Sequence, residues 1–250
     1  MTWNEEPKKE EESTPIEFKS LSNAEQKRGL KIGIYGDFST GKTHFCLTAP
    51  EPIFILDTEM GVSPLAHLFP DKDIKILDIR EEDGSDSYKK YIAAIDFLSK
   101  QEKVGTIIVD SITDVWSFCQ EYGKVEIFKI KPEQRLAQQW DWGVINKLYL
   151  QPLLKLMTIP CNLILTARAS EVYAGAGNPT GILSPSWMKK TPFWVDLVIY
   201  NTHKQDKLKG NIFNSRIEKC RQYGSLMGKT FTNLDFITLQ SEINKLKEVK

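Results

Sequence analysis

The sequence has few cysteines and no long apolar run. Its four cysteines, at positions 46, 119, 161 and 220, stand singly, with no C-x-x-C pair and no histidine at ligand spacing. This scatter argues against a zinc site or a disulfide framework and predicts reduced thiols in a core. No stretch approaches the roughly 20 apolar residues that span a bilayer, and the first residues lack the apolar centre of a signal peptide. We therefore expect a cytoplasmic protein without membrane contacts.

The sequence also lacks an excess of charge of either sign. Lys and Arg together number 33, and so do Asp and Glu. A chain with this balance has no global positive field that would draw it to nucleic acid or to anionic lipid. Any binding to such partners must therefore depend on a local group of residues.

Length and composition fit one sizeable α/β domain, because 41% of the 250 residues are hydrophobic. Residues 1–28 are polar and rich in Glu and Lys, which is typical of a flexible tail. We place the core domain at 29–232. The apolar spacing after it predicts a C-terminal helical tail at 233–250, docked on the core or on another subunit.

Short apolar runs alternate with segments of helical spacing along the core. The runs show little polar alternation, which is typical of strands buried on both faces. We predict helices over 42–49, 87–100 and 142–158. Strands are predicted at 30–35, 52–56, 74–79, 105–109, 161–166 and 195–200. This order predicts an α/β fold with a mostly parallel sheet flanked by helices.

Residues 36–43, GDFSTGKT, match the P-loop pattern G-x-x-x-x-G-K-[ST] between a predicted strand and a predicted helix. In such a loop, backbone N–H groups and the positive end of the helix surround a phosphate. Lys42 would reach the β- and γ-phosphates, and the Thr43 hydroxyl would ligate Mg²⁺. The pattern predicts a site for ATP and Mg²⁺. Its nucleotide-binding residues are Gly36, Asp37, Phe38, Ser39, Thr40, Gly41, Lys42, Thr43 and His44.

Carboxylates follow two of the predicted strands. Asp110 ends the strand at 105–109, where a Walker B aspartate would hold Mg²⁺ together with Thr43. Its alternative role is to cap the next helix, a role in which Ser111 would share. Asp57 and Glu59 lie just beyond the strand at 52–56, and one of them would orient the attacking water as a general base. Asp57 has a second interpretation as a turn residue.

The ordered series GDFSTGKT, FILDTEMGVSP and TIIVDSITDVW resembles the core of the RecA/RadA superfamily of P-loop ATPases. The likeness spans about residues 30–220. It is greatest to small single-domain phage-type members linked to single-strand annealing, and to KaiC and RadA-paralogue proteins. The resemblance implies a RecA-like fold and Mg²⁺-dependent ATP hydrolysis. It also implies that Glu59 is the catalytic glutamate and Asp110 the Walker B aspartate.

Two later stretches extend this resemblance. In CNLILTARAS, Thr166 takes the position of the family's polar sensor of the γ-phosphate, although that residue is often glutamine. In NIFNSRIEKCRQYG, Lys219 and Arg221 have K-x-R spacing, which on a strand places both side chains on one side. In KaiC-like and DnaB-like relatives such a pair reaches the neighbouring subunit's γ-phosphate. The resemblance therefore implies a homo-oligomer, either ring or filament. A solvated strand face is the alternative.

The segment 168–194 has few regular signals and contains aromatic residues interleaved with cations. We expect a long irregular loop that contacts single-stranded DNA, because stacking faces and positive charge are what single strands bind. The alternative is that Trp187 and Trp194 pack under the sheet edge. A second irregular segment, 130–143, contains Trp140 and Trp142, which we expect to be buried. The candidate DNA contacts are Arg168, Tyr173, Trp187, Lys189 and Lys190.

Three functions of different class fit these features. The first is an ATPase on single-stranded DNA in recombination or annealing, favoured by the segment 168–194. The second is a KaiC-like, nucleotide-dependent assembly or switch protein without nucleic acid, favoured by the zero net charge. The third is a small-molecule kinase, which would leave Glu59, Lys219 and Arg221 without a role.

Overall fold

The computed structural model of the protein describes residues 28–208 and 210–248. In this part of the chain one sheet of nine strands has the order β3-β2-β4-β5-β1-β7-β8-β9, and β6 pairs with β5 beyond it. The neighbouring strands β3, β2, β4, β5, β1 and β7 pair in parallel. The pairings that involve β6, β8 and β9 are antiparallel. The strands are β1 (Lys31–Gly36), β2 (Ile53–Asp57), β3 (Ile74–Asp78), β4 (Thr106–Asp110), β5 (Asn162–Tyr173), β6 (Pro179–Pro185), β7 (Leu197–Asp206), β8 (Gly210–Cys220) and β9 (Thr230–Thr232).

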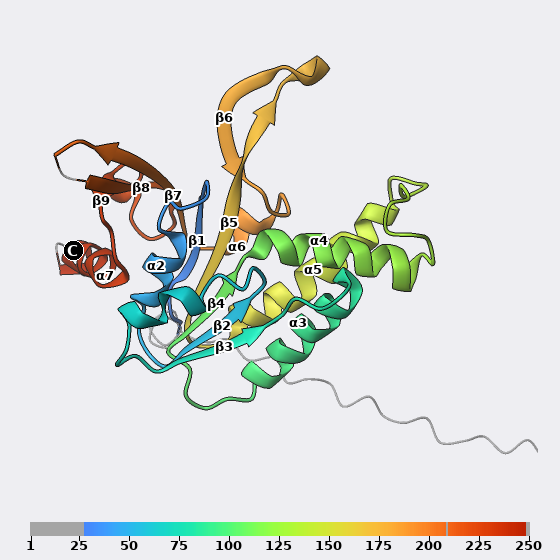
Figure 1. Ribbon diagram of the computed structural model, residues 1–250, viewed down its shortest axis with the longest axis horizontal. Helices are drawn as coiled ribbons and strands as arrows, with labels where there is room; N and C mark the ends of the chain where they lie inside the picture. Colours follow the sequence, from blue (N-terminus) through green and yellow to red (C-terminus); the bar gives the residue numbers. More distant parts are fainter. Residues whose placement is uncertain (1–27, 209, 249–250) are drawn as a thin grey trace, which may run out of the picture.

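Helices lie on both sides of this sheet (Figure 1). They are α2 (Lys42–Leu47), α3 (Gly84–Leu98), α4 (Ile112–Tyr122), α5 (Asp141–Thr158), α6 (Thr191–Trp194) and α7 (Phe236–Glu248). Short 3₁₀ turns occupy Ser63–Leu68, Gly175–Gly177 and Gly224–Leu226, and a π-helical turn, Gly123–Ile127, extends α4. The predicted α/β class with a mostly parallel, helix-flanked sheet is confirmed.

Two apolar cores sandwich the sheet because successive strand residues point to opposite faces. In β4, Ile107 and Val109 pack with α3, α4 and α5, whereas Ile108 faces α2 and α7 on the other side. All four cysteines are buried free thiols, as predicted. Both faces of the central strands are thus covered, and the carboxyl ends of the parallel strands meet at one edge.

The prediction that the run at 74–79 is buried on both faces is wrong. β3 is an edge strand of the sheet, and most of its residues are exposed. Ile76 and Leu77 are each 40% exposed. Only β2 flanks β3, so fewer side chains cover it than cover the central strands.

The prediction that 168–194 is a loop without regular structure is also wrong. β5 continues past the parallel sheet to Tyr173, turns through Gly175–Gly177 and returns as β6. The two strands form an antiparallel hairpin that projects from the body of the molecule (Figure 1). We call residues 168–186 the β5–β6 arm. The end of the segment forms the short helix α6.

The two ends of the chain differ in what the structure describes. Residues 1–27 of the predicted tail at 1–28 lie outside the described residues. In the predicted helical tail at 233–250, α7 is present and packs on the core through Phe236, Leu239 and Ile243. No helix among the described residues is long and apolar enough to cross a membrane.

Candidate functional site

The loop 36–43 joins β1 to α2 at the carboxyl edge of the sheet. Gly36 has no room for a side chain, since a Cβ there would lie 2.4 Å from the Asn201 carbonyl oxygen. Gly41 has a φ of +81°, which glycine adopts readily. The loop therefore depends on both glycines of the motif, and it leads directly into the N-terminus of α2.

Lys42 lies over this loop. Its Nζ donates hydrogen bonds to the carbonyl oxygens of Gly36 at 3.1 Å and of Asp37 at 2.7 Å. Burial lowers the pKa of the Lys42 ammonium, although the nearby carboxylates of Asp110 and Glu59 raise it. The lysine is thus held close to the backbone groups that would surround a phosphate.

Thr43 and Asp110 are brought together from 67 positions apart in the chain. The Thr43 hydroxyl donates to Asp110 Oδ2 at 2.8 Å, and the Thr166 hydroxyl donates to Asp110 Oδ1. Burial raises the pKa of the Asp110 carboxyl, and these two hydrogen bonds lower it. The next helix, α4, is capped by Ser111, whose side chain accepts from the Asp114 amide. Asp110 is therefore free of the capping role.

Asp57 and Glu59 have different surroundings. Both carboxylate oxygens of Asp57 accept backbone N–H groups, from Glu59 at 3.0 Å and from Val62 at 3.1 Å. Asp57 is buried and shapes the turn after β2. Glu59 is 38% exposed in its side chain and lines the same cavity as Lys42 and Asp110. Of the two carboxylates, Glu59 is the one that faces the site.

A cavity of about 720 Å³ extends from the P-loop toward β8 and the start of α7. Its far wall includes Asn211, Phe213 and Asp235, none of which the sequence motifs indicate. The Phe213 ring approaches Gly41, because a Cβ on Gly41 would lie 3.3 Å from its Cδ1. A cavity of this size is large enough to hold a nucleotide beside the loop.

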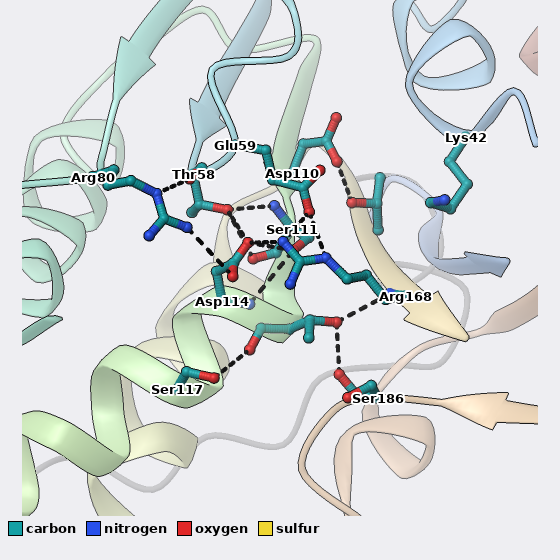
Figure 2. A network of polar contacts seen from close by, with 12 residues as sticks. Lys42, Thr58, Glu59, Arg80, Asp110, Ser111, Asp114, Ser117, Arg168 and Ser186 are labelled. Carbon is teal, nitrogen blue, oxygen red and sulfur yellow. Dashed lines mark hydrogen bonds and ion pairs between the residues drawn. The ribbon is translucent and has the colours of Figure 1, made fainter. Parts of the chain in front are cut away.

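Asp114, which the sequence interpretation missed, lies at the centre of a group of polar residues next to Glu59 and Asp110 (Figure 2). Asp114, in the first turn of α4, accepts hydrogen bonds from Thr58 and Ser111 and pairs with Arg80 and Arg168. The stretch TIIVDSITDVW contains Asp114, but Arg80 and Arg168 lie far from it in the sequence. No local pattern therefore indicates that these residues form ion pairs. Ion pairs of this kind can be identified only from the three-dimensional arrangement of the strands.

The candidate DNA contacts are not gathered in one place. Arg168 pairs with Glu59 inside the site, and Trp187 is only 8% exposed, packed on Gly33. Tyr173 is 63% exposed on the β5–β6 arm. Lys189 and Lys190 are exposed just after the arm. Trp140, expected to be buried, is instead 72% exposed, and Trp142 is 40% exposed.

Lys219 and Arg221 lie near the amino ends of the parallel strands, whereas the P-loop follows the carboxyl end of β1. Cys220, between them, pairs with Leu197 at the start of β7, which pairs with Ile32 near the start of β1. Lys219 Nζ donates to the carbonyl oxygens of Pro192 and Val195 at 2.5 and 2.7 Å. Arg221 donates to the Phe193 carbonyl oxygen and pairs with Asp196 at 3.5 Å. Neither cation lies near its own phosphate loop.

Comparison with protein-family models agrees with this geometry. A model described as "AAA domain" matches residues 28–232, which is most of the chain. The chain belongs to this AAA domain family. It therefore carries a P-loop ATPase domain of the AAA type, as the 36–43 motif predicts. A comparison with curated proteins found no match. The finer likeness of this AAA domain to RecA, RadA and KaiC stays a prediction.

Proposed function

We propose that this AAA domain hydrolyses ATP with Mg²⁺ and acts on single-stranded DNA in recombination or annealing. One observation supports this combination above others. Strand β5 carries Thr166, which bonds to Asp110, then Arg168, which bonds to Glu59, and then continues into the exposed β5–β6 arm. A single strand thus links the nucleotide site to a projecting surface on which a partner can act.

In the proposed reaction the side chains take separate roles. The P-loop N–H groups and Lys42 bind and orient the phosphates, and Glu59 accepts a proton from the attacking water. Thr43 and Asp110 supply adjacent hard oxygen ligands, which fit Mg²⁺. When bound, Mg²⁺ neutralises charge that develops on the phosphate oxygens. Thr166 fixes the Asp110 carboxylate and so acts through it.

For the DNA contact we propose Tyr173, Lys189 and Lys190. Tyr173 offers an exposed ring for base stacking, and the two lysines offer charge for phosphates. The buried Trp187 and the ion-paired Arg168 are left out of this contact. Local charge of this kind is compatible with a chain of zero net charge.

We predict that single-stranded oligo-dT raises the ATPase rate and that duplex DNA of equal length does not. Tyr173→Ala combined with Lys189→Ala and Lys190→Ala should weaken oligo-dT binding about 10-fold or more, because stacking and phosphate contacts are both lost. Fluorescence anisotropy measures the binding. Phe97→Ala is the matched control, since Phe97 is an aromatic residue 59% exposed on α3.

The outcome also decides between the two leading functions. A rate indifferent to both DNAs, together with unchanged binding by the triple variant, would favour the nucleotide-dependent assembly protein without nucleic acid. The observation that favours this second candidate is the position of Lys219 and Arg221, remote from their own P-loop.

We further propose that the chain forms a head-to-tail homo-oligomer, ring or filament. Lys219 and Arg221 would then lie against the next subunit's nucleotide site and supply charge to its transition state. Phe193 and Trp194, next to the carbonyl groups that bind these cations, are 72% and 38% exposed. An exposed aromatic pair beside the two cations is suited to an interface between subunits.

We predict that mixing Lys42→Ala with Arg221→Ala restores activity that neither variant has alone. In a mixed oligomer the first variant lends its Arg221 to the intact P-loop of the second. The control mixes Arg221→Ala with the double variant Lys42→Ala, Arg221→Ala, which has no arginine to lend. Phosphate release measures both mixtures. Equal rates in the two mixtures, with a wild-type rate independent of protein concentration, would rule out the shared site.

A further inference from the structure

Arg168 connects the candidate base Glu59 to a buried carboxylate. Its Nε and Nη2 donate hydrogen bonds to Glu59 Oε1 at 3.0 and 2.8 Å. The same Nη2 donates to Asp114 Oδ2 at 2.9 Å (Figure 2). The guanidinium therefore lies between two carboxylates, one that lines the nucleotide cavity and one that belongs to α4.

Asp114 is a firm support for this guanidinium. Its side chain is only 10% exposed. Its Oδ2 also accepts from Thr58 Oγ1 at 3.1 Å and from Ser111 Oγ at 3.0 Å, and Arg80 lies 3.4 Å from its Oδ1. With so many partners, the Asp114 carboxylate has little freedom to rotate.

The backbone of Arg168 is fixed as well. Its N–H donates to Thr113 Oγ1 at 3.0 Å, and the Thr113 hydroxyl donates to the Ser186 carbonyl oxygen at 2.6 Å. The Ser186 N–H donates in turn to the Arg168 carbonyl oxygen at 2.8 Å. These bonds fasten both ends of the β5–β6 arm to the start of α4, so Arg168 is held at main chain and side chain.

We infer that Arg168 is a positioning residue for Glu59, an inference that depends on the proposed role of Glu59 as the base. Glu59 lies on a turn and is partly exposed, so alone it would sample several rotamers. The two bonds from Arg168 go to Oε1 and leave Oε2 to accept a proton from water. A base oriented by a third group that is itself fixed is an arrangement typical of catalytic sites.

This role predicts an effect on catalysis with little effect on folding. The Glu59 and Arg168 side chains are 38% and 51% exposed, and ion pairs that open to solvent add little to stability. The buried Asp114 carboxylate keeps Thr58, Ser111 and Arg80 as partners when Arg168 is replaced, so its charge stays paired. Misplacing a catalytic group, in contrast, lowers the rate steeply. The inference also gives Arg168 a different role from the DNA contact expected from the sequence.

We predict that Arg168→Gln lowers kcat about 10-fold while KM and the melting temperature stay near wild type. Arg168→Lys, which keeps the charge but loses the fork of donors, should recover part of the rate. The matched control is Arg80→Gln, because Arg80 pairs with Asp114 but has no bond to Glu59. All rates are measured by phosphate release without nucleic acid, so the result does not depend on DNA binding.

A double-mutant cycle tests whether Arg168 acts through Glu59. In a Glu59→Gln background, Arg168→Gln should cause no further loss, because there is no base left to position. An equal loss in both backgrounds, a rate unchanged by Arg168→Gln alone, or an equal loss in Arg80→Gln would overturn the inference. If Glu59→Gln itself keeps the wild-type rate, the proposed base is wrong and the inference fails with it. That result differs from a failure of Arg168 alone.

Discussion

Replacing Lys42 with alanine is expected to abolish ATP hydrolysis and leave the fold intact. Lys42 is the P-loop side chain whose charge lies against the loop, at the Gly36 and Asp37 carbonyl oxygens. Removing one preorganised donor to developing negative charge costs about 100- to 1,000-fold in rate, and here a full charge is lost as well. We therefore expect a loss of about 1,000-fold in phosphate release, with weaker binding of a fluorescent ATP analogue.

The matched control for this variant is Lys72→Ala. Lys72 Nζ also donates to two carbonyl oxygens, those of Leu47 and Ala49, at the end of α2 opposite the P-loop. Its removal tests whether disturbing α2 alone lowers the rate, and we expect nearly wild-type turnover. Full ATPase activity in Lys42→Ala, with an unchanged circular dichroism spectrum, would contradict the P-loop interpretation of residues 36–43.

The parallel part of the fold was predictable because its strands carry their own signal. A central strand such as β4 is buried on both faces, so its three middle residues, Ile107 to Val109, are all apolar and the strand is readable from the sequence. The run IKILD of β3 is also mainly apolar, apart from Lys75 and Asp78, but it is largely exposed. Whether a strand is central or at an edge depends on the order of the strands in the sheet. The residues of one strand do not determine that order.

The β5–β6 arm shows a second limit. Its Gly and Ala residues at 174–177 and the proline at 179 suggested a break in structure. The same residues form the turn that lets β5 pair with β6. A Gly-rich stretch forms a loop or the turn of a hairpin, depending on whether the residues on its two sides pair with each other. Here Ala169–Glu171 pair with Leu183–Pro185, so the stretch forms a hairpin turn.

The motifs identified about half of the residues that line the nucleotide cavity, but not the partner that orients Glu59. Lys42, Thr43, Glu59 and Asp110 stand in recognisable patterns and line one cavity. The partner of Glu59, Arg168, is 109 positions away, and it was interpreted as a DNA contact because it stands near aromatic and basic residues. Ion pairs between distant segments follow from strand order, so sequence patterns of local spacing miss them.

Replacing Glu59 with glutamine is expected to lower turnover by about 100-fold or more while ATP still binds. Glutamine keeps the size of the side chain, and its amide oxygen can still accept from Arg168. It loses the negative charge and with it the basicity needed to take a proton from water. Single-turnover hydrolysis gives the rate, and the fluorescent ATP analogue gives the affinity.

Asp57→Asn provides the comparison that gives this last experiment its meaning. Because both Asp57 oxygens accept backbone N–H groups, an asparagine loses one acceptor and should lower the melting temperature. Glu59→Gln should leave the melting temperature unchanged, since its side chain is partly exposed. If Asp57→Asn instead lowers the rate without affecting stability, and Glu59→Gln keeps the wild-type rate, the base would be Asp57. The turn after β2 would then have to open during the reaction, because the Asp57 carboxylate is fully used in holding it closed.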